Sequence, residues 1–415
     1  MTSTPTRIAV LAHAGVLGSS GYARRVLDCA HSLRRAMPCA VVTVASLETP
    51  RNLRRRVERQ AVTLALTKAG IAFHVVHAWP RRWGLAGLSN RLAAATFARF
   101  LDRERIDVVH AHGPDALALA FAARGGRGVR VVADVHGDRA TEAMLDRGEG
   151  GGFDVPPDST EAAAVAKADG VVYASEGLRE RLPAGAGRSS IVVTCLVSDE
   201  SIPSETDAEG MRLAARKARG LAGDEWVAAY VGSLASWQEF PRFARIVRHL
   251  TDRVPQFRVL VLTPDRAAAE ACLREAGVPT GRVIVRTAAQ GVVVSDLLAA
   301  DAGVLLRRPA LANALAFPTK FAEYAAAGLE IVVSDAVPSV AGIVSRHPGL
   351  GHVLPWEKDD STWAARLAGA SRPSEPAARA ARRAFARSHL ATSSSDGAYA
   401  RLYDGLGLGT ILTRS

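Results

Sequence analysis

The residues best placed to do chemistry lie in the run Phe317–Asp335, where Lys320 and Glu323 fall within one turn of a predicted helix. Pro318 suits a first helical turn, because its missing N–H would be unpaired there anyway. Thr319 and Lys320 would then lie at a helix N-terminus, where backbone N–H groups and an ammonium can bind phosphate oxygens. One turn later, a carboxylate can bridge two vicinal hydroxyls. The alternative is a solvated Lys and Glu, which the scarcity of lysine (five in the chain) disfavours.

A glycine-containing loop near the N-terminus follows an apolar run at residues 8–11 and precedes an amphipathic segment at 22–35. Its glycines are Gly15, Gly18 and Gly21. They would let the backbone approach a ligand, and the following helix start would offer N–H groups to an anion. The spacing is not that of the dinucleotide motif G-x-G-x-x-G, and an ordinary glycine-rich turn remains an alternative.

A second glycine turn, Gly232-Ser233, follows the apolar run at residues 226–231. It would lie at the carboxyl end of a strand, where ligands of parallel sheets bind. An ordinary strand-to-helix turn is again the alternative.

Three histidines lie at the ends of two predicted strands. His110 and His112 alternate along one strand and therefore point to the same side. His136 ends the next strand, two residues after Asp134. A single histidine there could be a core residue, but three at neighbouring strand ends favour a functional site. Because His110 and His112 lack the i, i+4 spacing of a helical zinc site, we expect no bound metal.

Elements that could position these residues alternate along the chain. Short Val- and Ile-rich runs are separated by Ala-, Leu- and Arg-rich helical stretches, which is typical of parallel strands covered on both faces. The strands expected in the first half are 8–11, 40–45, 71–76, 107–110, 129–135, 170–173 and 190–194. Those expected in the second half are 226–231, 258–262, 283–285, 303–306 and 331–333.

The pattern predicts an α/β fold of two facing doubly wound, Rossmann-like domains with a ligand cleft at the carboxyl ends of both sheets. We place the N-terminal domain at residues 1–200, a polar linker at 201–224 and the C-terminal domain at 225–385. Residues 386–415 form a helical tail.

Composition limits the protein classes to consider. The chain has 415 residues, 48% of them hydrophobic and 22% charged, so it can bury real cores and is not globally disordered. Its four cysteines are too few for a disulfide scaffold. The sequence shows neither a signal peptide nor an apolar run long enough to span a membrane, so we expect a cytoplasmic protein. The net charge of +11 reflects arginine usage or an anionic partner.

Five segments together resemble the family-four group of retaining glycosyltransferases, which have the GT-B fold. They are DVVHAHGPD (107–115), VVADVHGD (131–138), ADGVVYASEGLRERL (168–182), YVGSLASWQ (230–238) and FPTKFAEYAAAGLEIVVSD (317–335). Each is weakly specific, but they occur in the order of that family. The resemblance implies two Rossmann-like domains and a C-terminal helix that returns to the first.

The resemblance also implies roles for the C-terminal segments. Glu323 matches the second carboxylate of the family's Glu-x7-Glu motif, which bridges the ribose hydroxyls. Thr319 and Lys320 match the turn that holds the donor diphosphate. Gly232 and Ser233 match the glycine turn under the phosphates.

In the N-terminal half, the resemblance implies that Gly15, Gly18 and Gly21 approach the diphosphate from the other side. His136 matches the family's active-site histidine near the transferred sugar. The segment Thr287–Gly291 of the second half would lie near the base. Catalytic roles are therefore expected for His136, Glu323 and Lys320.

Two departures from the family pattern bear on the donor. The first Glu of the motif would fall at Leu315, with Asn313 as the nearest polar residue. The basic pair that usually follows the glycine turn is replaced by Trp237-Gln238. The candidates to meet the phosphate charge are then Lys320 and Arg307 or Arg308.

The predicted function is transfer of a sugar from a nucleotide diphosphate sugar to an acceptor held by the first domain, with retention, without a metal and without a cofactor. Two alternatives stay open. One is a non-catalytic nucleotide-sugar-binding partner protein, and the other is a nucleotide-sugar 2-epimerase.

The expected partners are the donor and an acceptor that the sequence does not identify, with no nucleic acid, since no nucleic-acid-binding motif is visible. The Arg-rich segment Arg51–Arg59 and the Trp/Arg segment Trp79–Trp83 also suit a bilayer interface. Peripheral contact with the inner face of a membrane is therefore a second prediction, and a solvated helix and loop are its alternative.

Overall fold

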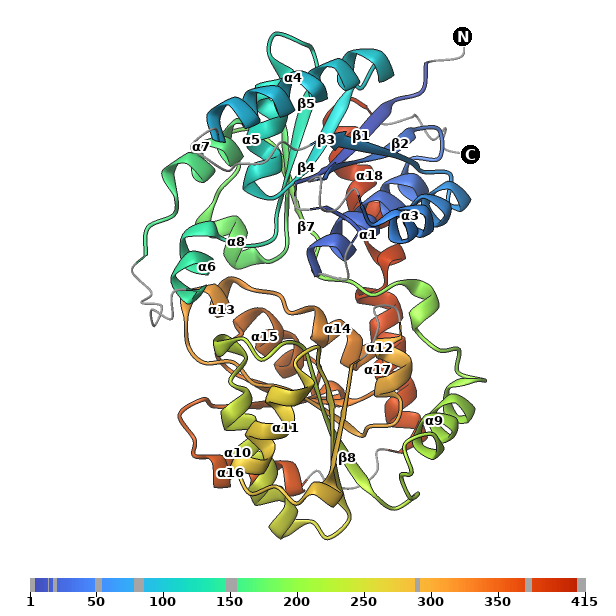
Figure 1. Ribbon diagram of the computed structural model, residues 1–415, viewed down its shortest axis with the longest axis vertical. Helices are drawn as coiled ribbons and strands as arrows, with labels where there is room; N and C mark the ends of the chain where they lie inside the picture. Colours follow the sequence, from blue (N-terminus) through green and yellow to red (C-terminus); the bar gives the residue numbers. More distant parts are fainter. Residues whose placement is uncertain are drawn as a thin grey trace. The chain divides into compact units, whose positions relative to one another are not determined.

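The protein folds into two compact α/β units, drawn in Figure 1. The structure is a computed structural model that describes residues 4–13, 15–17, 21–48, 54–77, 86–146, 155–287, 292–369 and 375–408. Unit 1 comprises Met1–Ala140, Pro156–Thr194 and Thr392–Ser415, and unit 2 comprises Thr141–Val155 and Cys195–Ala391.

Unit 1 is built on a parallel sheet with the strand order β3-β2-β1-β4-β5-β6-β7. Its strands are β1 (Arg7–Ala12), β2 (Val41–Glu48), β3 (Ala72–His77), β4 (Val108–His112), β5 (Arg130–Val135), β6 (Gly170–Tyr173) and β7 (Ser189–Val192). Its helices are α1 (Gly21–Ala36), α3 (Arg56–Lys68), α4 (Ala86–Glu104), α5 (Gly113–Arg124), α7 (Ser159–Lys167), α8 (Glu176–Arg181) and α18 (Asp396–Gly405), while α6 (Arg139–Asp146) runs from unit 1 into unit 2.

Unit 2 repeats this plan with the parallel order β10-β9-β8-β11-β12-β13. Its strands are β8 (Trp226–Val231), β9 (Phe257–Leu262), β10 (Val283–Arg286), β11 (Ala302–Leu305), β12 (Glu330–Ser334) and β13 (Gly351–Leu354). Its helices are α9 (Ala208–Lys217), α10 (Phe240–Arg253), α11 (Arg266–Glu275), α12 (Val293–Leu297), α13 (Leu311–Leu315), α14 (Thr319–Ala326), α15 (Pro338–Arg346), α16 (Asp360–Gly369) and α17 (Pro376–His389). Short 3₁₀ turns are Asp199–Ser201, Ser236–Gln238, Thr280–Arg282, Pro348–Leu350 and, in unit 1, Thr392–Ser395.

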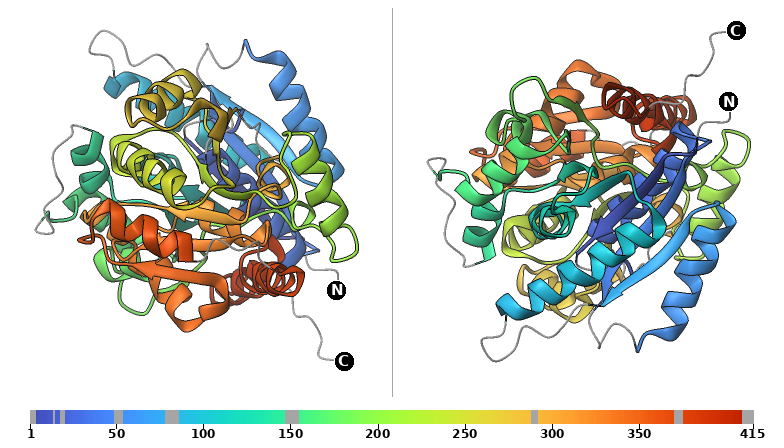
Figure 2. Two further views of the ribbon diagram at one scale, coloured as in Figure 1. Left: turned by 90° about the horizontal axis from the view of Figure 1, so that it is seen from below. Right: turned by 90° about the horizontal axis from the view of Figure 1, so that it is seen from above.

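Both sheets confirm the prediction of two doubly wound, Rossmann-like domains. Strand order reverses between β1 and β4 in unit 1 and between β8 and β11 in unit 2. In such sheets the crevice outside the carboxyl ends of the strands at the reversal is the usual ligand site. The buried strands are continuous apolar runs because helices cover both faces of each sheet, as Figure 2 shows.

The C-terminal tail returns to unit 1 as predicted, but it is broken into two helices. α17 ends at His389, and the polar run Thr392–Ser395 forms a 3₁₀ turn in which the Ser395 hydroxyl donates to the Thr392 carbonyl. Such short side-chain bonds to the backbone compete with helix continuation. α18 then packs on α1, where Arg35 Nε lies 2.8 Å from Asp396 Oδ2.

The segment predicted as a linker contains helix α9. Arg212 on this helix is buried and donates to Asp301 Oδ1 at 2.6 Å and to the Ala300 carbonyl at 2.6 Å. These bonds tie α9 to unit 2. The signal in the sequence was weak because the helix buries arginines rather than an apolar stripe.

Helix α14, which carries Lys320 and Glu323, is positioned by a close approach to β11. A Cβ at Gly303 would lie only 2.4 Å from the Tyr324 ring, so the ring packs directly on the strand backbone. The Tyr324 hydroxyl donates to the Val304 carbonyl at 3.2 Å and accepts from the Val231 amide at 3.2 Å. One aromatic side chain therefore connects α14 to both strands at the reversal of the sheet.

We expect Gly303→Ala to destabilise unit 2 by about 1–3 kcal/mol, because an added methyl group must displace a fully packed ring. Chemical denaturation measures this loss. Gly281→Ala is the control, since a Cβ there would meet nothing within 4 Å. Equal stability of the two variants would show that α14 is not seated through this contact.

Candidate functional site

The glycine loop of unit 1 leaves β1 at the strand reversal. Gly15 has a φ of 77°, a conformation that L side chains rarely adopt. The next amide, that of Val16, donates to Ser46 Oγ at 3.2 Å and to Glu48 Oε1 at 3.3 Å. The loop is therefore anchored to the end of β2 by a fully buried carboxylate that the sequence analysis did not single out. In the sequence, Glu48 is recognisable as an acidic residue that ends an apolar run.

The other two glycines of this loop are less informative. Gly18 lies outside the described residues. Gly21 is the first residue of α1, and a Cβ there would meet no atom within 4 Å. The described structure therefore shows a positive φ at Gly15 but no close approach at Gly21.

His136 follows β5 directly and points its Nε2 atom into the protein. That atom is buried and has no hydrogen-bond partner among the described residues. The imidazole meets Tyr22 edge-on, with ring centroids 5.4 Å apart, and a Cβ at Gly113 would lie 3.6 Å from Nε2. Burial lowers the pKa of His136 to about 4, because the imidazolium would be desolvated. His136 is therefore neutral at pH 7, so it can donate or accept a hydrogen bond but carries no charge.

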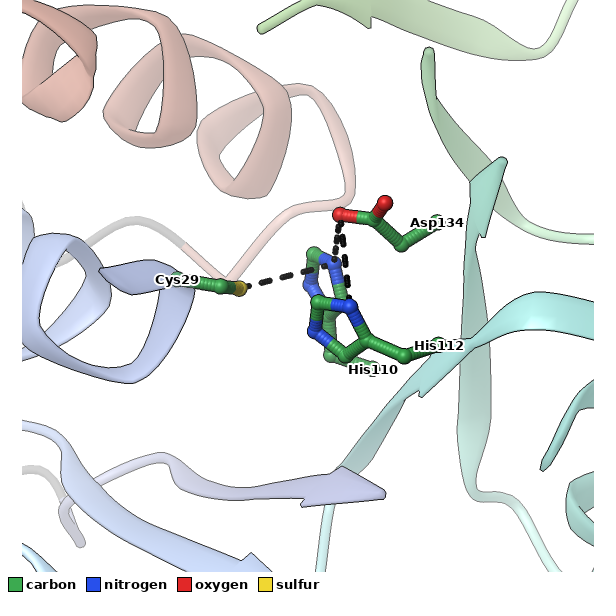
Figure 3. A group of neighbouring side chains, drawn as sticks. All are labelled: Cys29, His110, His112 and Asp134. Atoms are coloured by element: carbon green, nitrogen blue, oxygen red, sulfur yellow. Dashed lines mark hydrogen bonds and ion pairs between the residues drawn. The ribbon is translucent and has the colours of Figure 1, made fainter. Parts of the chain in front are cut away.

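A buried polar cluster, drawn in Figure 3, lies near His136, whose ring centroid is 6.0 Å from that of His112. Cys29 reaches it from α1, His110 and His112 from β4, and Asp134 from β5. His110 Nε2 lies 3.6 Å from Cys29 Sγ and 3.4 Å from Asp134 Oδ2, and His112 Nδ1 lies 3.8 Å from the same oxygen. The four ligand-type atoms all lie within 4.8 Å of one another, so residue types and distances alone would suit a metal ion.

The charges of this cluster are already matched by a fifth residue. Arg25 donates from Nε to Asp134 Oδ1 at 2.7 Å and from Nη1 to the Val193 carbonyl at 3.0 Å. Burial opposes ionisation of Asp134, but Arg25 and the histidines outweigh it and hold its pKa well below the usual range. The charges of the cluster are thus compensated within the protein. The absence of a metal stays a prediction.

The two histidines of the cluster differ in charge. Burial disfavours protonation of both, but Cys29 and Asp134 raise the pKa of His110 to about 9. His110 also lies 2.9 Å from the Tyr403 hydroxyl of α18. Burial lowers the pKa of His112 well below its usual value, so this residue is neutral. Both its ring nitrogens lack hydrogen-bond partners among the described residues.

In unit 2, Lys320 is buried at the start of α14, which excludes the alternative of a solvated lysine. Its side chain is only 6% exposed. The ammonium donates to Gln238 Oε1 at 2.6 Å and lies 4.7 Å from the centroid of the Tyr230 ring. Burial and then the nearby Arg307 lower the pKa of Lys320 well below its usual value. Glu323, one turn along, is also buried.

Gly232 brings the glycine turn against this lysine. Its φ is 126°, and a Cβ would lie 3.4 Å from Lys320 Nζ and 3.7 Å from Gln238 Nε2. The Ser233 carbonyl accepts from the Tyr230 hydroxyl at 2.6 Å. The structure thus gathers Gly232, Lys320 and Gln238 at the carboxyl end of β8. The sequence analysis did not predict Gln238 and Tyr230 as partners of Lys320, because neither side chain carries a charge.

The remaining predicted residues of unit 2 are placed as follows. Thr319 is the first residue of α14, after Pro318. Leu315 is buried on α13, so no polar group replaces the first motif Glu at that position. Thr287 donates to the Thr263 carbonyl at 3.2 Å, and residues 288–291 of the predicted base-binding segment lie outside the described residues.

Comparisons with known proteins agree with this architecture. Residues 20–196 match the model of the glycosyl transferase 4-like domain. Over 97% of the chain and 99% of the other, the fold resembles sucrose-phosphate synthase from Thermosynechococcus elongatus, with a TM-score of 0.71 and 15% identity. No curated protein is similar enough in sequence to count as a relative.

Two further solved structures have the same fold. HepE from Anabaena, solved in complex with UDP, has a TM-score of 0.68 at 15% identity, over 96% of this chain and 100% of that one. A UDP-forming trehalose-phosphate synthase from Burkholderia xenovorans has a TM-score of 0.64 at 14% identity, over 98% and 100%. Residues 20–196 thus resemble a glycosyl transferase 4-like domain, and the predicted fold of two Rossmann-like domains is confirmed.

We expect Asp134→Ala to cost about 3–5 kcal/mol of stability, because it leaves Arg25 and His110 charged and buried without their counter-ion. Thermal and urea unfolding of the full chain measure this. Asp102→Ala is the matched control: Asp102 forms a solvent-exposed pair with Arg127, so its loss should barely change the midpoint. A mild effect of Asp134→Ala would mean that the network does not hold unit 1 together.

Proposed function

We propose that this protein is a glycosyltransferase that takes its glycosyl group from a nucleoside diphosphate sugar, which unit 2 binds, and passes it to an acceptor bound by unit 1. The observation that supports a diphosphate donor is the start of α14, where a buried ammonium, free helix N–H groups and a glycine turn meet. Helix N-termini and lysines of this kind bind phosphate oxygens. That HepE, of the same fold, was solved with UDP agrees with the proposal.

The proposed reaction needs stabilisation of a leaving diphosphate. As the bond between the sugar C1 and the phosphate oxygen breaks, its electron pair moves onto that oxygen. Lys320 and the first N–H groups of α14 would stabilise this growing charge. The acceptor oxygen forms the new bond to C1 on the same face, and its proton passes to the departing phosphate. Attack on that face retains the anomeric configuration.

In this scheme His136 and Glu323 bind and orient rather than carry the chemistry alone. Because the pKa of His136 is about 4, its neutral imidazole would hydrogen-bond a sugar hydroxyl near the reaction centre. Glu323 would bridge the ribose hydroxyls of the donor. Deprotonation of the acceptor is left to the phosphate.

Peripheral membrane contact is a separate proposal that concerns α3 of unit 1. Arg54, Arg55 and Arg56 are exposed at its start, and Val57 and Leu64 are 76% and 58% exposed. Exposed apolar residues beside arginines suit an anionic bilayer surface. The Trp/Arg segment predicted to join them lies outside the described residues, and none of the described helices is long and apolar enough to cross a membrane. Sedimentation with anionic vesicles at low salt measures the contact.

We expect Lys320→Ala to lower kcat/KM with the true donor by about 100-fold, because it removes a cation that acts on the leaving group. Glu323→Ala should raise KM by about tenfold with a smaller change in kcat, since ribose contacts are similar in ground and transition states. Steady-state kinetics measure both. Lys358→Ala, at an exposed lysine, is the control.

If both Lys320→Ala and Glu323→Ala turn over donor like the unmodified protein, the proposed donor site is wrong. If the unmodified protein binds a nucleoside diphosphate tightly but neither hydrolyses nor transfers any donor sugar, the chain is a binder rather than an enzyme.

Metal independence and retention of the anomeric configuration are tested by separate measurements. We expect turnover to persist in excess EDTA, and we expect no stoichiometric metal in the purified protein, because Arg25 already neutralises the carboxylate of the cluster around His110. The product anomer, followed by proton NMR during the first turnovers, should match that of the donor. Loss of activity in EDTA that zinc restores would assign a metal to the cluster instead.

A further inference from the structure

The parallel sheet of unit 2 ends in an edge strand, β13, that no described strand covers on its outer side. In unit 1, four strands, β4 to β7, follow β1 on one side of the strand reversal. In unit 2, only the three strands β11, β12 and β13 follow β8 on that side. Strand β13 therefore has the position that β6 has in unit 1, and the described part of unit 2 contains no counterpart of β7.

The two strands at this position differ in exposure. All four residues of β6 are buried, and β7 pairs with them from Gly170 to Tyr173. In β13, by contrast, His352 is exposed and Val353 is only partly buried. An edge strand presents unpaired N–H and C=O groups that can pair with another strand. Strand β13 thus has a free edge where its counterpart in unit 1 has a neighbour.

The backbone groups that face this free edge belong to Val353. The Leu354 carbonyl accepts from the Asp335 amide at 3.1 Å, so the N–H and C=O of Leu354 point towards β12. Successive residues of a strand direct these groups to opposite sides, so those of Val353 point away from β12. Pro355 has no N–H and limits further pairing to the length of β13, which is four residues. Strand β7 of unit 1 is equally short.

A groove of about 910 Å³ lies along β13, between helices α15 and α16. Val344 of α15 and Trp363 of α16 contribute apolar lining. Val353 packs against the core cluster that contains Val344, whereas Leu354 belongs to the cluster of Trp363. The two helices therefore cover opposite faces of the sheet, and the groove opens between them at its edge. It leaves room for an extended chain whose side chains point alternately to the two faces.

The charged side chains that line this groove favour an acidic ligand. Lys358 and Arg366 both line it and are exposed. Neither forms an ion pair with an Asp or Glu in the part of the chain that the structure describes. His352 also lines the groove, but its Nε2 lies 2.9 Å from Glu330 Oε1, which compensates its charge when it is protonated. The lining residues include no carboxylate among those described.

The carboxylates nearest to this groove in the sequence do not change this conclusion. Asp359 accepts from the Thr362 amide at 2.7 Å, and Asp360 Oδ1 lies 2.8 Å from Arg242 Nε. Glu357 is exposed but does not line the groove. The lining therefore keeps a net positive charge, which attracts an anionic partner.

We propose that β13 and the groove beside it bind an acidic, extended segment of a partner protein, which adds to the sheet of unit 2 as a further strand. The backbone of the partner pairs with Val353, and its carboxylates lie near Lys358 and Arg366. In such strand additions the main-chain hydrogen bonds give affinity, and pockets for alternate side chains give specificity. The inference concerns the edge of the sheet and is independent of the proposed glycosyl transfer.

The first test is fluorescence polarisation with the full chain and labelled synthetic peptides of about six residues, which alternate Glu with Val, Leu or Phe. The best of them should bind about tenfold more tightly than the same peptide with Lys in place of Glu, because two cations border the groove. The double variant Lys358→Glu/Arg366→Glu should reverse this preference. The control, Lys217→Glu/Arg274→Glu, changes the charge equally at exposed residues outside the groove and should preserve it. If no acidic peptide binds, or if the Lys peptide binds equally well, the proposal is wrong.

Hydrogen exchange separates strand addition from attraction between charges alone. Bound acidic peptide should slow exchange of the Val353 N–H by about tenfold or more, because this group gains a hydrogen-bond partner. The Leu354 N–H, which already points towards β12, should change little. N-methylation of one alternate set of peptide residues should abolish binding, and N-methylation of the other set should not. Unchanged exchange at Val353, or equal binding of both methylated peptides, would overturn the proposal.

A second copy of this chain is the competing occupant of the edge. Pairing of β13 with itself brings the cations of two copies together, so charge disfavours it. Val353→Pro removes the outward N–H, and an edge strand tolerates proline there. This variant should sediment like the unmodified protein but bind the peptide more weakly, while Val353→Thr binds normally. Thermal melting checks that both variants are folded. If the unmodified protein is a dimer and Val353→Pro is a monomer, a second copy covers the edge and the acidic partner is wrong.

Discussion

The arrangement of unit 2 depends on the contact between the Tyr324 ring and the bare backbone of β11 at Gly303. This contact brings α14 closer to the sheet than any side chain at residue 303 would allow. The tyrosine hydroxyl then links β8 and β11 through the Val231 amide and the Val304 carbonyl. Because the helix is fixed one turn after its start, its first residues are fixed too. Lys320 consequently lies against the glycine turn at Gly232, and the position of the ammonium follows from packing rather than from charge.

Packing must fix the position of Lys320, because burial and nearby positive charge oppose an ammonium there. Burial and the charge of Arg307 both disfavour the charged form of Lys320, while the carboxylate of Glu323 favours it. Asn313 and Gln238 orient the Arg307 and Lys320 side chains. A site that holds like charges together without a ligand stores unfavourable energy that an anion relieves. Such stored energy is a common cost of function, and here the close-packed sheet and α14 offset it.

Much of the fold followed from the sequence, because its strands are continuous Val-, Ile- and Ala-rich runs that period and composition identify. The exceptions have physical reasons. Strand β13 was missed because Gly351 and the exposed His352 break any apolar run. Helix α9 was read as a linker because it is anchored by Arg212. At the site, Lys320 was found from its place at a helix start. The unpaired charge of Arg307 was not visible in the sequence, because pairing depends on which side chains the fold brings near.

The candidate sites of the two units differ in the charge of their buried polar groups, and this contrast argues for a division of roles. In unit 1, Asp134 is neutralised by Arg25 and accepts from His110, so these charges compensate one another. Among the buried side-chain atoms of unit 1 that have no hydrogen-bond partner is the imidazole Nε2 of His136, which is neutral at pH 7. A neutral hydrogen-bonding group suits hydroxyls of a sugar or acceptor, whose recognition needs direction rather than charge. In the site of unit 2, the buried Nε of Arg307 has no hydrogen-bond partner among the described residues, and a guanidinium suits a diphosphate.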